Sequence, residues 1–379
     1  MKKIFFITGE TSGDIHAANL LSELYKIIPK DLLIAEAIGE ERLKEVGADI
    51  FFNSKYLASM GVTEIIKKLS LYLNLERELI FKLSVFRPDV LILVDFPGFN
   101  LRIAKKVKKL LPDIKIVYYM PPQVWAWNVN RTKILAKCCD LVLCGLPFEE
   151  EFHKAHGVNA FYVGSPITHE LKQFDREKTR DEFGIKKDEL LVGLFPGSRK
   201  SEIHLMLPVL IKASELLQKV FPKIKFLIAQ APNINLSNGK IKILSPDNNH
   251  KLLCASDIVW LTSGTVTLEA ALYETPLILG YRGNIINYFI FLLLKKINLI
   301  GLPNIIYGKK IVPELIQNNA TGENYFQITK SWLENPNELE KIKTSLKAVK
   351  EKITDKNASR EAALKIRELI PEYKVLTMK

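Results

Sequence analysis

The chain has 379 residues, 47% of them hydrophobic, which suits a folded protein of two domains and excludes a disordered one. Its 54 Lys and Arg against 42 Asp and Glu give a net charge of +12. This charge suits nucleic acid, an anionic membrane or an anionic small substrate, or reflects a lysine-rich composition that only aids solubility. We expect no nucleic-acid partner, because the sequence contains no zinc finger, RRM or basic-aromatic stripe.

The cysteines and the apolar runs indicate a cytoplasmic protein that is at most peripheral to a membrane. The N-terminal apolar run is too short for a signal peptide and leads directly into a glycine turn. The run from Ile285 to Leu294 falls short of the roughly 20 residues that span a bilayer. Apolar surroundings without paired ligand spacing predict buried free thiols at Cys138, Cys139, Cys144 and Cys254.

The first predicted unit is a strand, a glycine loop and a helix. The strand covers Lys3 to Thr8, and helical spacing runs from Ile15 to Ile28. Open α/β sheets bind ligands at the carboxyl ends of their strands, so the loop GETSGD at 9–14 is a candidate site. The alternative is a plain turn, and the dinucleotide pattern G-x-G-x-x-G is absent. The candidate residues in this loop are Gly9, Ser12 (also a candidate helix cap), Gly13 and Asp14.

A fully apolar strand, Val90 to Val94, follows a helical region at 61–83 and ends at Asp95. Enzymes with α/β sheets place chemistry at this end of a buried strand, and a carboxylate there can act as a general base. Asp95 is therefore a candidate catalytic residue. The alternative is that Asp95 only caps the following helix.

The loop MPPQVWAW at 120–127 follows a strand predicted from Lys115 to Tyr119. Two prolines and two tryptophans make this loop stiff, so it either contacts a ligand, with Trp125 as the candidate, or packs between domains. Helices are predicted at 131–136 and from 147, with strands at 140–144 and 160–163. The pattern breaks at Gly164-Ser165-Pro166, where we place a domain boundary.

A new α/β series begins with a strand from Leu190 to Phe195, and its loop PGSR at 196–199 leads to a helix from Glu202. Arg199 beside a glycine turn suits a phosphate, because guanidinium binds phosphate oxygens bidentately. The alternative is a surface arginine at a turn. Ser198 belongs to the same candidate site. Further strands are predicted at 225–229 and 240–244, and a helix at 249–255.

The stretch from Val259 to Arg282 carries the second candidate phosphate site. A buried strand ends at Leu261, a polar turn containing Ser263-Gly264-Thr265 follows, and Val266 to Leu272 has helical spacing. A helix that begins at such a turn points free N–H groups at a phosphate. Glu269, one turn into the helix, can accept hydrogen bonds from ribose hydroxyls. The alternative is an ordinary strand–loop–helix unit in which Ser263 or Thr265 is only the N-cap.

The remaining elements are a strand from Leu277, a loop at 301–304, a charged helix at 323–352 and a final amphipathic helix at 358–369. Several of the segments above occur in the order typical of one family. They are GETSGD at 9–14, VWAW at 124–127, LPFE at 146–149, PGSR at 196–199, SGT at 263–265 with Glu269, GYR at 280–282 and LPN at 302–304.

This ordered set resembles the lipid-A-disaccharide synthase family. The resemblance implies the GT-B form of the α/β class, with two Rossmann-like domains facing across a cleft and a C-terminal helix crossing back to the first. It implies that residues 1–165 with 354–379 form the acceptor- and membrane-facing domain, and that residues 166–353 bind the UDP-sugar. It also implies a peripheral place on the inner face of the inner membrane.

The resemblance implies a site as well. Asp95 and Arg199 match catalytic residues of the family, while Gly98 stands where relatives often carry a second acid. The substrate-binding residues that it implies are Gly9, Ser12, Gly13, Asp14, Trp125, Ser198, Ser263, Gly264, Thr265, Glu269, Tyr281, Arg282 and Asn304.

The implied reaction transfers 2,3-diacylglucosamine from UDP to O6 of 2,3-diacylglucosamine 1-phosphate, giving a β-1,6 disaccharide and UDP. Inversion requires one in-line displacement, with Asp95 as the base and Arg199 plus the turn at 263–265 stabilising the UDP that departs. No Asp-x-Asp pair occurs, so we expect no metal, and no cofactor is implied.

Other functions stay open at this point. An epimerase acting on UDP-N-acetylglucosamine or a polyprenyl-linked sugar transferase fits the same fold, and a nonenzymatic nucleotide-sugar-binding protein is the alternative of another class. The oligomeric state is also open, with a homodimer among the alternatives.

The apolar residues between Ile65 and Leu73 are too many for one buried stripe, so some are expected to face outward. With Lys67 and Lys68 among them, this helix is predicted to seat the protein on a membrane and to receive acyl chains. The alternative is a fully buried helix, with the membrane contact elsewhere, for example at 285–296.

Overall fold

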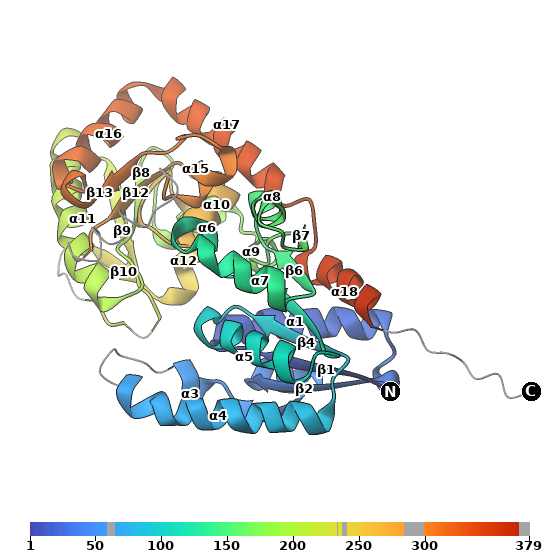
Figure 1. Cartoon of the computed structure of the whole chain (residues 1–379). Coiled ribbons are helices and arrows are strands. Elements are labelled where there is room, and N and C mark those ends of the chain that lie inside the picture. The colour runs from blue at the N-terminus through green and yellow to red at the C-terminus, as the bar shows by residue number, and fades with distance from the viewer. Residues whose placement is uncertain (59–64, 233, 237–240, 284–298, 371–379) are drawn as a thin grey trace, which may run out of the picture. The chain divides into compact units, whose positions relative to one another are not determined.

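The structure is a computed structural model in which the chain divides into two compact units, each with its own sheet and core (Figure 1). Unit 1 comprises Met1–Pro166 and Asp355–Lys379, and unit 2 comprises Ile167–Thr354. The residues that the structure describes are 1–58, 65–232, 234–236, 241–283 and 299–370.

Unit 1 contains a seven-stranded parallel sheet in the order β3-β2-β1-β4-β5-β6-β7. Its central strands are buried on both faces, as their continuous apolar runs predict. The strands are β1 Lys2–Ile7, β2 Leu33–Gly39, β3 Asp49–Asn53, β4 Val90–Val94, β5 Lys115–Tyr119, β6 Leu141–Cys144 and β7 Ala160–Tyr162.

Helices cover both faces of this sheet because alternate residues of each strand point to opposite sides. Phe5 and Ile7 of β1 join one core cluster, with residues of α4, α5 and α7, whereas Ile4 and Phe6 join the other, with residues of α1, α2 and α18. The helices of unit 1 are α1 Thr11–Ile27, α2 Glu41–Val46, α3 Lys55–Ala58, α4 Ile65–Phe86, α5 Pro97–Leu110, α6 Val124–Trp127, α7 Thr132–Cys138, α8 Pro147–Ala155 and α18 Ala358–Leu369.

The last helix returns to the first unit of the chain. α18 packs beside α1, and Ala362, Ala363 and Ile366 are buried in the shared core (Figure 1). The Lys356 ammonium donates to the Tyr162 carbonyl 3.2 Å away at the return point. The predicted return of the C-terminal helix is therefore confirmed.

Unit 2 contains a six-stranded parallel sheet in the order β10-β9-β8-β11-β12-β13. The strands are β8 Leu190–Phe195, β9 Ile224–Ala229, β10 Lys242–Leu244, β11 Ile258–Thr262, β12 Leu277–Tyr281 and β13 Glu314–Ile316. The prediction of two α/β domains with parallel sheets is confirmed, while the cleft between them stays a prediction.

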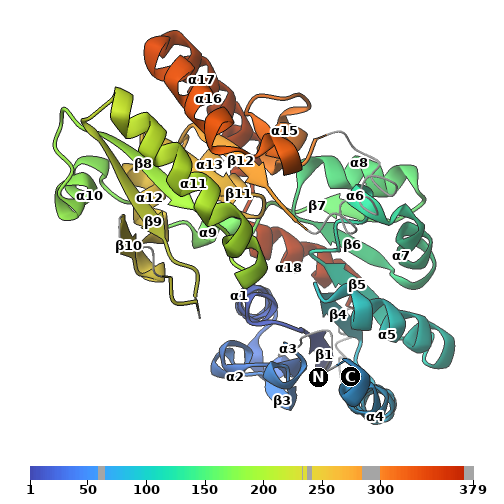
Figure 2. The ribbon, with the colours of Figure 1, turned by 90° about the vertical axis from the view of Figure 1, so that its left-hand side faces the viewer.

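The core of unit 2 centres on Trp260 of β11, whose ring lies 5.4 Å from that of Tyr325 and whose Nε1 donates to Thr329 Oγ1 at 3.0 Å. Both partners lie on α16, which packs beside α11 (Figure 2). The helices of unit 2 are α9 Ile167–Glu170, α10 Arg176–Phe183, α11 Lys200–Val220, α12 Asn249–Ala255, α13 Val266–Leu272, α15 Leu302–Tyr307, α16 Gly322–Glu334 and α17 Pro336–Ile353.

Several predicted boundaries were wrong. α1 begins at Thr11, so Ser12 lies in its first turn and does not cap it. The segment predicted as a loop at 120–127 contains the short helix α6, and that at 301–304 contains the start of α15. The single charged helix predicted at 323–352 is two helices that part at Asn335, because Pro336 cannot continue the first.

The cysteines carry no disulfide, as predicted. Cys138, Cys139 and Cys144 are buried and Cys254 is half-buried. Burial raises the pKa of all four thiols, which makes them poor nucleophiles. The apolar run at 285–294 lies outside the described residues. Among the residues that are described, no helix is long and apolar enough to cross a bilayer.

Candidate active site

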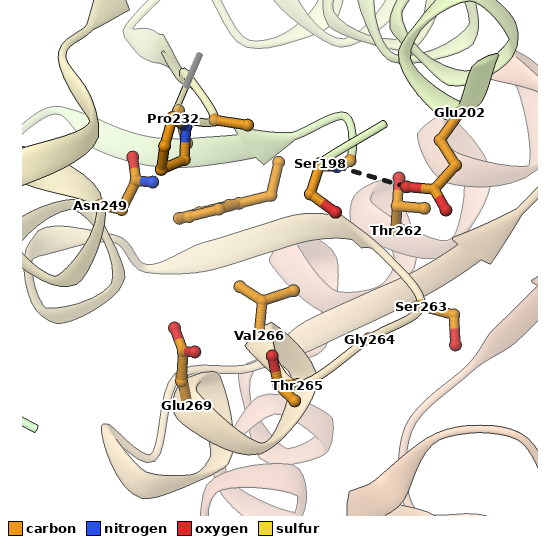
Figure 3. Close-up of a pocket in the computed structure, with 14 residues that line it drawn as sticks. Ser198, Glu202, Pro232, Asn249, Thr262, Ser263, Gly264, Thr265, Val266 and Glu269 are labelled. Atoms are coloured by element: carbon orange, nitrogen blue, oxygen red, sulfur yellow. Dashed lines mark hydrogen bonds between the residues drawn. The ribbon is translucent and has the colours of Figure 1, made fainter. Parts of the chain in front are cut away.

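A pocket of about 300 Å³ opens in unit 2 beyond the carboxyl ends of β8, β9 and β11 (Figure 3). This is the end of a parallel sheet where α/β proteins bind ligands. Its 14 lining residues are Phe195, Gly197, Ser198, Glu202, Ala229, Ala231, Pro232, Asn249, Thr262, Ser263, Gly264, Thr265, Val266 and Glu269.

The turn at 263–265 forms one wall of this pocket, as Figure 3 shows. The Ser263 N–H donates to the Gly280 carbonyl at 3.0 Å, which attaches the turn to β12. Thr267 Oγ1 donates to the Gly264 carbonyl at 2.8 Å and orders the entry to α13. The sequence-predicted residues Ser263, Gly264, Thr265 and Glu269 therefore line one cavity together with Ser198.

The pocket also contains polar groups that the sequence analysis missed. Asn249 donates through Nδ2 to the Gln230 carbonyl at 3.2 Å, which fixes the orientation of its amide. Its Oδ1 and the Thr262 Oγ1 are buried, with no hydrogen-bond partner in the described part of the chain. Because a buried polar atom without a partner costs free energy, both mark the pocket wall as a surface for a polar ligand or water.

The loop before α11 is ordered by Glu202, another residue that the sequence analysis missed. One Glu202 oxygen accepts from the Ser198 and Arg199 N–H groups, each at 3.3 Å. Gly197 has φ +123°, and a Cβ at this position would lie 2.9 Å from the Glu202 Cβ. The sequence did contain a signal for this role, because Glu202 stands three residues after Arg199, at the position of the acid in a capping box.

Arg199 is not among the lining residues. Its side chain is 79% exposed and donates through a guanidinium N–H to Glu202 at 3.2 Å. A phosphate in the pocket would have to draw the guanidinium away from Glu202. An exposed ion pair of this kind contributes little stability, so the cost of that exchange is small.

Asn304 is a structural residue of unit 2. It is fully buried, and its Oδ1 accepts from the Ile311 and Val312 N–H groups. Its Nδ2 donates to the Val312 carbonyl at 3.0 Å and to the Glu314 carboxylate at 2.8 Å. Since both ends of the amide are engaged, the predicted substrate contact of Asn304 is corrected to a role in ordering the loop before β13.

Tyr281 is the last residue of β12 and Arg282 follows it; both are half-buried, and they do not line the pocket. A Cβ on Gly280 would collide with the Tyr325 hydroxyl, so close packing against α16 accounts for the glycine of this motif. Gln317 exchanges hydrogen bonds with Gly283. Asn284 lies outside the described residues.

In unit 1, Asp95 follows β4 directly, as predicted. Its backbone is left-handed, with φ +47°, a conformation that Asp and Asn tolerate better than most residues. Asn100 Nδ2 donates to the Asp95 carbonyl at 2.8 Å, and the Tyr118 hydroxyl donates to the same oxygen at 2.6 Å. These two bonds hold the backbone in this conformation, so the carboxylate projects from a defined position.

The electrostatics of Asp95 suit a base. Although the residue as a whole is exposed, protein atoms crowd the carboxyl group, so burial raises its pKa above the ordinary value. A hydrogen bond from the Phe96 N–H and the charge of nearby His16 act in the opposite direction. A carboxylate with a raised pKa is a stronger proton acceptor.

The predicted site residues in the loop after β1 differ in their exposure and contacts. Ser12 is exposed, and Gly13 packs against Val94 at the end of β4. Gly9 is required by packing, because a Cβ there would collide with the Phe96 ring. Ser12 and Gly13 thus lie at the same sheet edge as Asp95.

Asp14 is fully buried, and its two oxygens accept from the Glu40 N–H at 2.6 Å and the Arg42 N–H at 3.0 Å. It therefore satisfies the N-terminus of α2. The predicted substrate contact of Asp14 is corrected to this structural role.

Trp125 is also buried. Its Nε1 donates to Glu149 Oε1 at 2.9 Å, and its ring meets Phe148 at a centroid distance of 4.9 Å. The other Glu149 oxygen accepts from the Leu146 N–H at 3.2 Å, and burial raises the pKa of Glu149 to about 7. The Trp125 side chain thus attaches α6 to α8, which corrects its predicted ligand contact. The side chain of Trp127 lies outside the described residues.

Solved structures share the fold with this chain at low sequence identity. A UDP-N-acetylglucosamine 2-epimerase from Neisseria meningitidis bound to UDP-GlcNAc has a TM-score of 0.62 at 14% identity, over 97% of this chain and 98% of that chain. The glycotransferase of kitacinnamycin has a TM-score of 0.62 at 12% identity, over 97% and 99%. These likenesses show the GT-B fold, which epimerases and glycosyltransferases share.

Sequence comparison distinguishes between the epimerases and the glycosyltransferases that share this fold. A family model described as lipid-A-disaccharide synthetase matches residues 4–367. The lipid-A-disaccharide synthase of Myxococcus xanthus is 33% identical over 98% of this chain and 99% of its own length. That of Nitrosococcus oceani is 38% identical over 84% of each chain. The chain therefore belongs to the lipid-A-disaccharide synthase family.

Proposed function

We propose that this protein transfers 2,3-diacylglucosamine from its UDP-linked donor to O6 of 2,3-diacylglucosamine 1-phosphate, forming a β-1,6 disaccharide and UDP. The observation that carries the proposal, in a chain of this family, is the pocket beyond β8 and β11. It combines Ser198 and the turn at 263–265 for a diphosphate with Glu269 for a ribose. Unit 2 would thus hold the donor, and unit 1 would supply Asp95 to the acceptor.

The chemistry is one displacement with inversion. Asp95 accepts the proton of the O6 hydroxyl as that oxygen bonds to the anomeric carbon of the donor. The bond from this carbon to the β-phosphate oxygen breaks, and its electron pair leaves with UDP. The backbone N–H groups of Gly264 and Thr265 and the Arg199 guanidinium stabilise the charge on the phosphate that departs.

A UDP-release assay tests the proposal. We expect UDP release to require both acylated sugars and to survive an excess of EDTA, because Arg199 and backbone N–H groups take the place of a metal clamp. Loss of activity that Mg²⁺ or Mn²⁺ restores would contradict the metal-free mechanism. Turnover of the donor without any acceptor would instead favour an epimerase or a hydrolase.

We also propose that the protein acts at the inner face of the inner membrane, with α4 as the contact. On this helix Leu73, Phe81 and Val85 are exposed, at 43%, 71% and 66%. Their spacing places them on one helical face, opposite the buried Leu75, Leu79 and Leu83. An acylated substrate needs such a surface near its chains. The side chains at 65–70, including Lys67 and Lys68, lie outside the described residues.

Replacing Leu73, Phe81 and Val85 together with serine should reduce vesicle flotation while changing the melting temperature little, because all three side chains are exposed. Leu110→Ser on α5 is the control, since Leu110 is 56% exposed on another helix. Undiminished flotation of the triple variant on anionic vesicles would exclude this face as the membrane contact.

A further inference from the structure

Glu269 has a neighbour to which the reaction above assigns no role. The Nε2 of His250 lies 3.5 Å from the Glu269 Oε2. Both side chains are largely covered by protein, with exposed fractions of 30% and 20%. In Figure 3 the Glu269 carboxylate points from α13 into the pocket. His250 therefore lies next to a pocket carboxylate, close to one of its oxygens.

The imidazole is held by two elements. His250 is the second residue of α12, directly after Asn249, whose amide attaches the start of this helix to the end of β9. On α13 the imidazole contacts Glu269 and, at a centroid distance of 6.3 Å, the ring of Tyr273 one turn later. The Tyr273 hydroxyl in turn donates to the Lys172 carbonyl at 2.6 Å. The imidazole thus lies between the Glu269 carboxylate and the Tyr273 ring.

We propose that His250 is a positioning residue that orients the Glu269 carboxylate toward the ribose hydroxyls of a nucleoside diphosphate. This inference rests on the proposed function, which places a UDP-linked sugar in the pocket. The terminal torsion of a glutamate is broad, so a carboxylate without a neighbour samples many orientations. With Oε2 next to Nε2 of His250, Oε1 is the oxygen that would accept from a ribose hydroxyl. Hydroxyl groups of a ribose are hydrogen-bond donors that suit a charged acceptor of this kind.

The proposal predicts which ligands will lose affinity when His250 is replaced. A hydrogen bond to a charged group contributes roughly 1.5–3 kcal/mol, so the wild-type protein should prefer UDP over 2′,3′-dideoxy-UDP by about tenfold or more. His250→Ala should remove most of this preference by weakening UDP alone. Loss of a merely structural contact would weaken both ligands equally. The donor KM should rise accordingly while kcat changes little, because His250 lies at the ribose and not at the reacting carbon.

Two further variants separate positioning from folding. His250→Gln can still donate an N–H to Glu269 and should restore part of the preference. Lys251→Ala is the matched control on the same helix, because Lys251 pairs instead with Glu182 at 2.6 Å. It should bind both ligands as the wild type does.

The experiment is calorimetric titration of UDP and 2′,3′-dideoxy-UDP into the wild type, His250→Ala, His250→Gln and Lys251→Ala. Selective loss of UDP affinity in His250→Ala, with partial recovery in His250→Gln, supports the proposal. An unchanged preference in His250→Ala, or equal losses for both ligands, overturns it. If the wild type binds UDP but does not prefer it over the dideoxy compound, the proposed contact of Glu269 with the ribose is wrong as well. If the wild type does not bind UDP at all, the proposed function itself is wrong.

Discussion

Asp95→Asn should lower kcat by about 10²–10⁴-fold, the usual cost of losing a general base. Asparagine keeps the shape of the side chain and, like aspartate, tolerates the left-handed backbone found at this position. The hydrogen bonds from Asn100 and Tyr118 go to the backbone carbonyl of residue 95 and do not depend on its side chain. The loss should therefore appear in turnover and not in folding.

The pH dependence gives a second readout of the same change. The base must be ionised, and burial raises the pKa of Asp95, so wild-type activity should fall as the pH drops through a value above that of an ordinary aspartate. The residual activity of Asp95→Asn should not show this fall at low pH. Measuring kcat against pH for both proteins checks the assignment.

The matched control is Asp89→Asn, at the opposite end of β4. Asp89 accepts from the Lys3 N–H at 2.8 Å, and asparagine can accept the same bond. This variant should retain turnover. Wild-type turnover of Asp95→Asn would reject Asp95 as the base. A large drop in its melting temperature would indicate a structural role instead.

Arg199→Ala should lower kcat/KM by about 10²–10³-fold, the range seen when one preorganised donor to a developing negative charge is removed. The guanidinium is mostly exposed and bonded to Glu202, so its removal should hardly change stability. Arg199→Lys should recover only part of the activity, because an ammonium is a point charge that cannot bind two phosphate oxygens as a fork.

Steady-state kinetics with varied donor concentration measure the effect of Arg199. Lys200→Ala is the control, since Lys200 is the next residue, is also exposed, and lines a different groove. Full activity of Arg199→Lys would argue against a bidentate contact. Full activity of Arg199→Ala would remove the residue from the mechanism.

Local patterns in the sequence determined the fold class and indicated the edge of each sheet where we propose that ligands bind. The apolar runs Val90–Val94 and Leu190–Phe195 match β4 and β8 residue for residue, because strands buried on both faces are uniformly apolar. The strand–turn–helix pattern around Ser263 placed Glu269 correctly in the same cavity as the turn. The motif order also identified the family, since it depends on sequence alone.

Only the tertiary structure decided which polar residues of those motifs face a cavity. Asp14, Trp125 and Asn304 occur in family motifs, yet each is buried and its polar atoms bond to other parts of the protein. The partners of Asp14 and Trp125 follow 24 to 28 residues later, so no local pattern reveals them. Asn249 shows the reverse, because nothing in its sequence neighbourhood marks it as a pocket residue.

The strands β2, β3 and β13 likewise escaped the sequence analysis, because none has a continuous apolar run: Glu36 interrupts β2, and the edge strands β3 and β13 are short and begin with an acid. The periodicity of apolar residues shows which side of a segment packs against the core. It does not show which distant segment forms a hydrogen bond with a given polar atom. The sequence by itself thus determined the fold class and the family, and it predicted the sheet edges where we propose that ligands bind. Chain packing alone decided which side chains order the loops, and it brought His250 next to Glu269, two residues on separate helices.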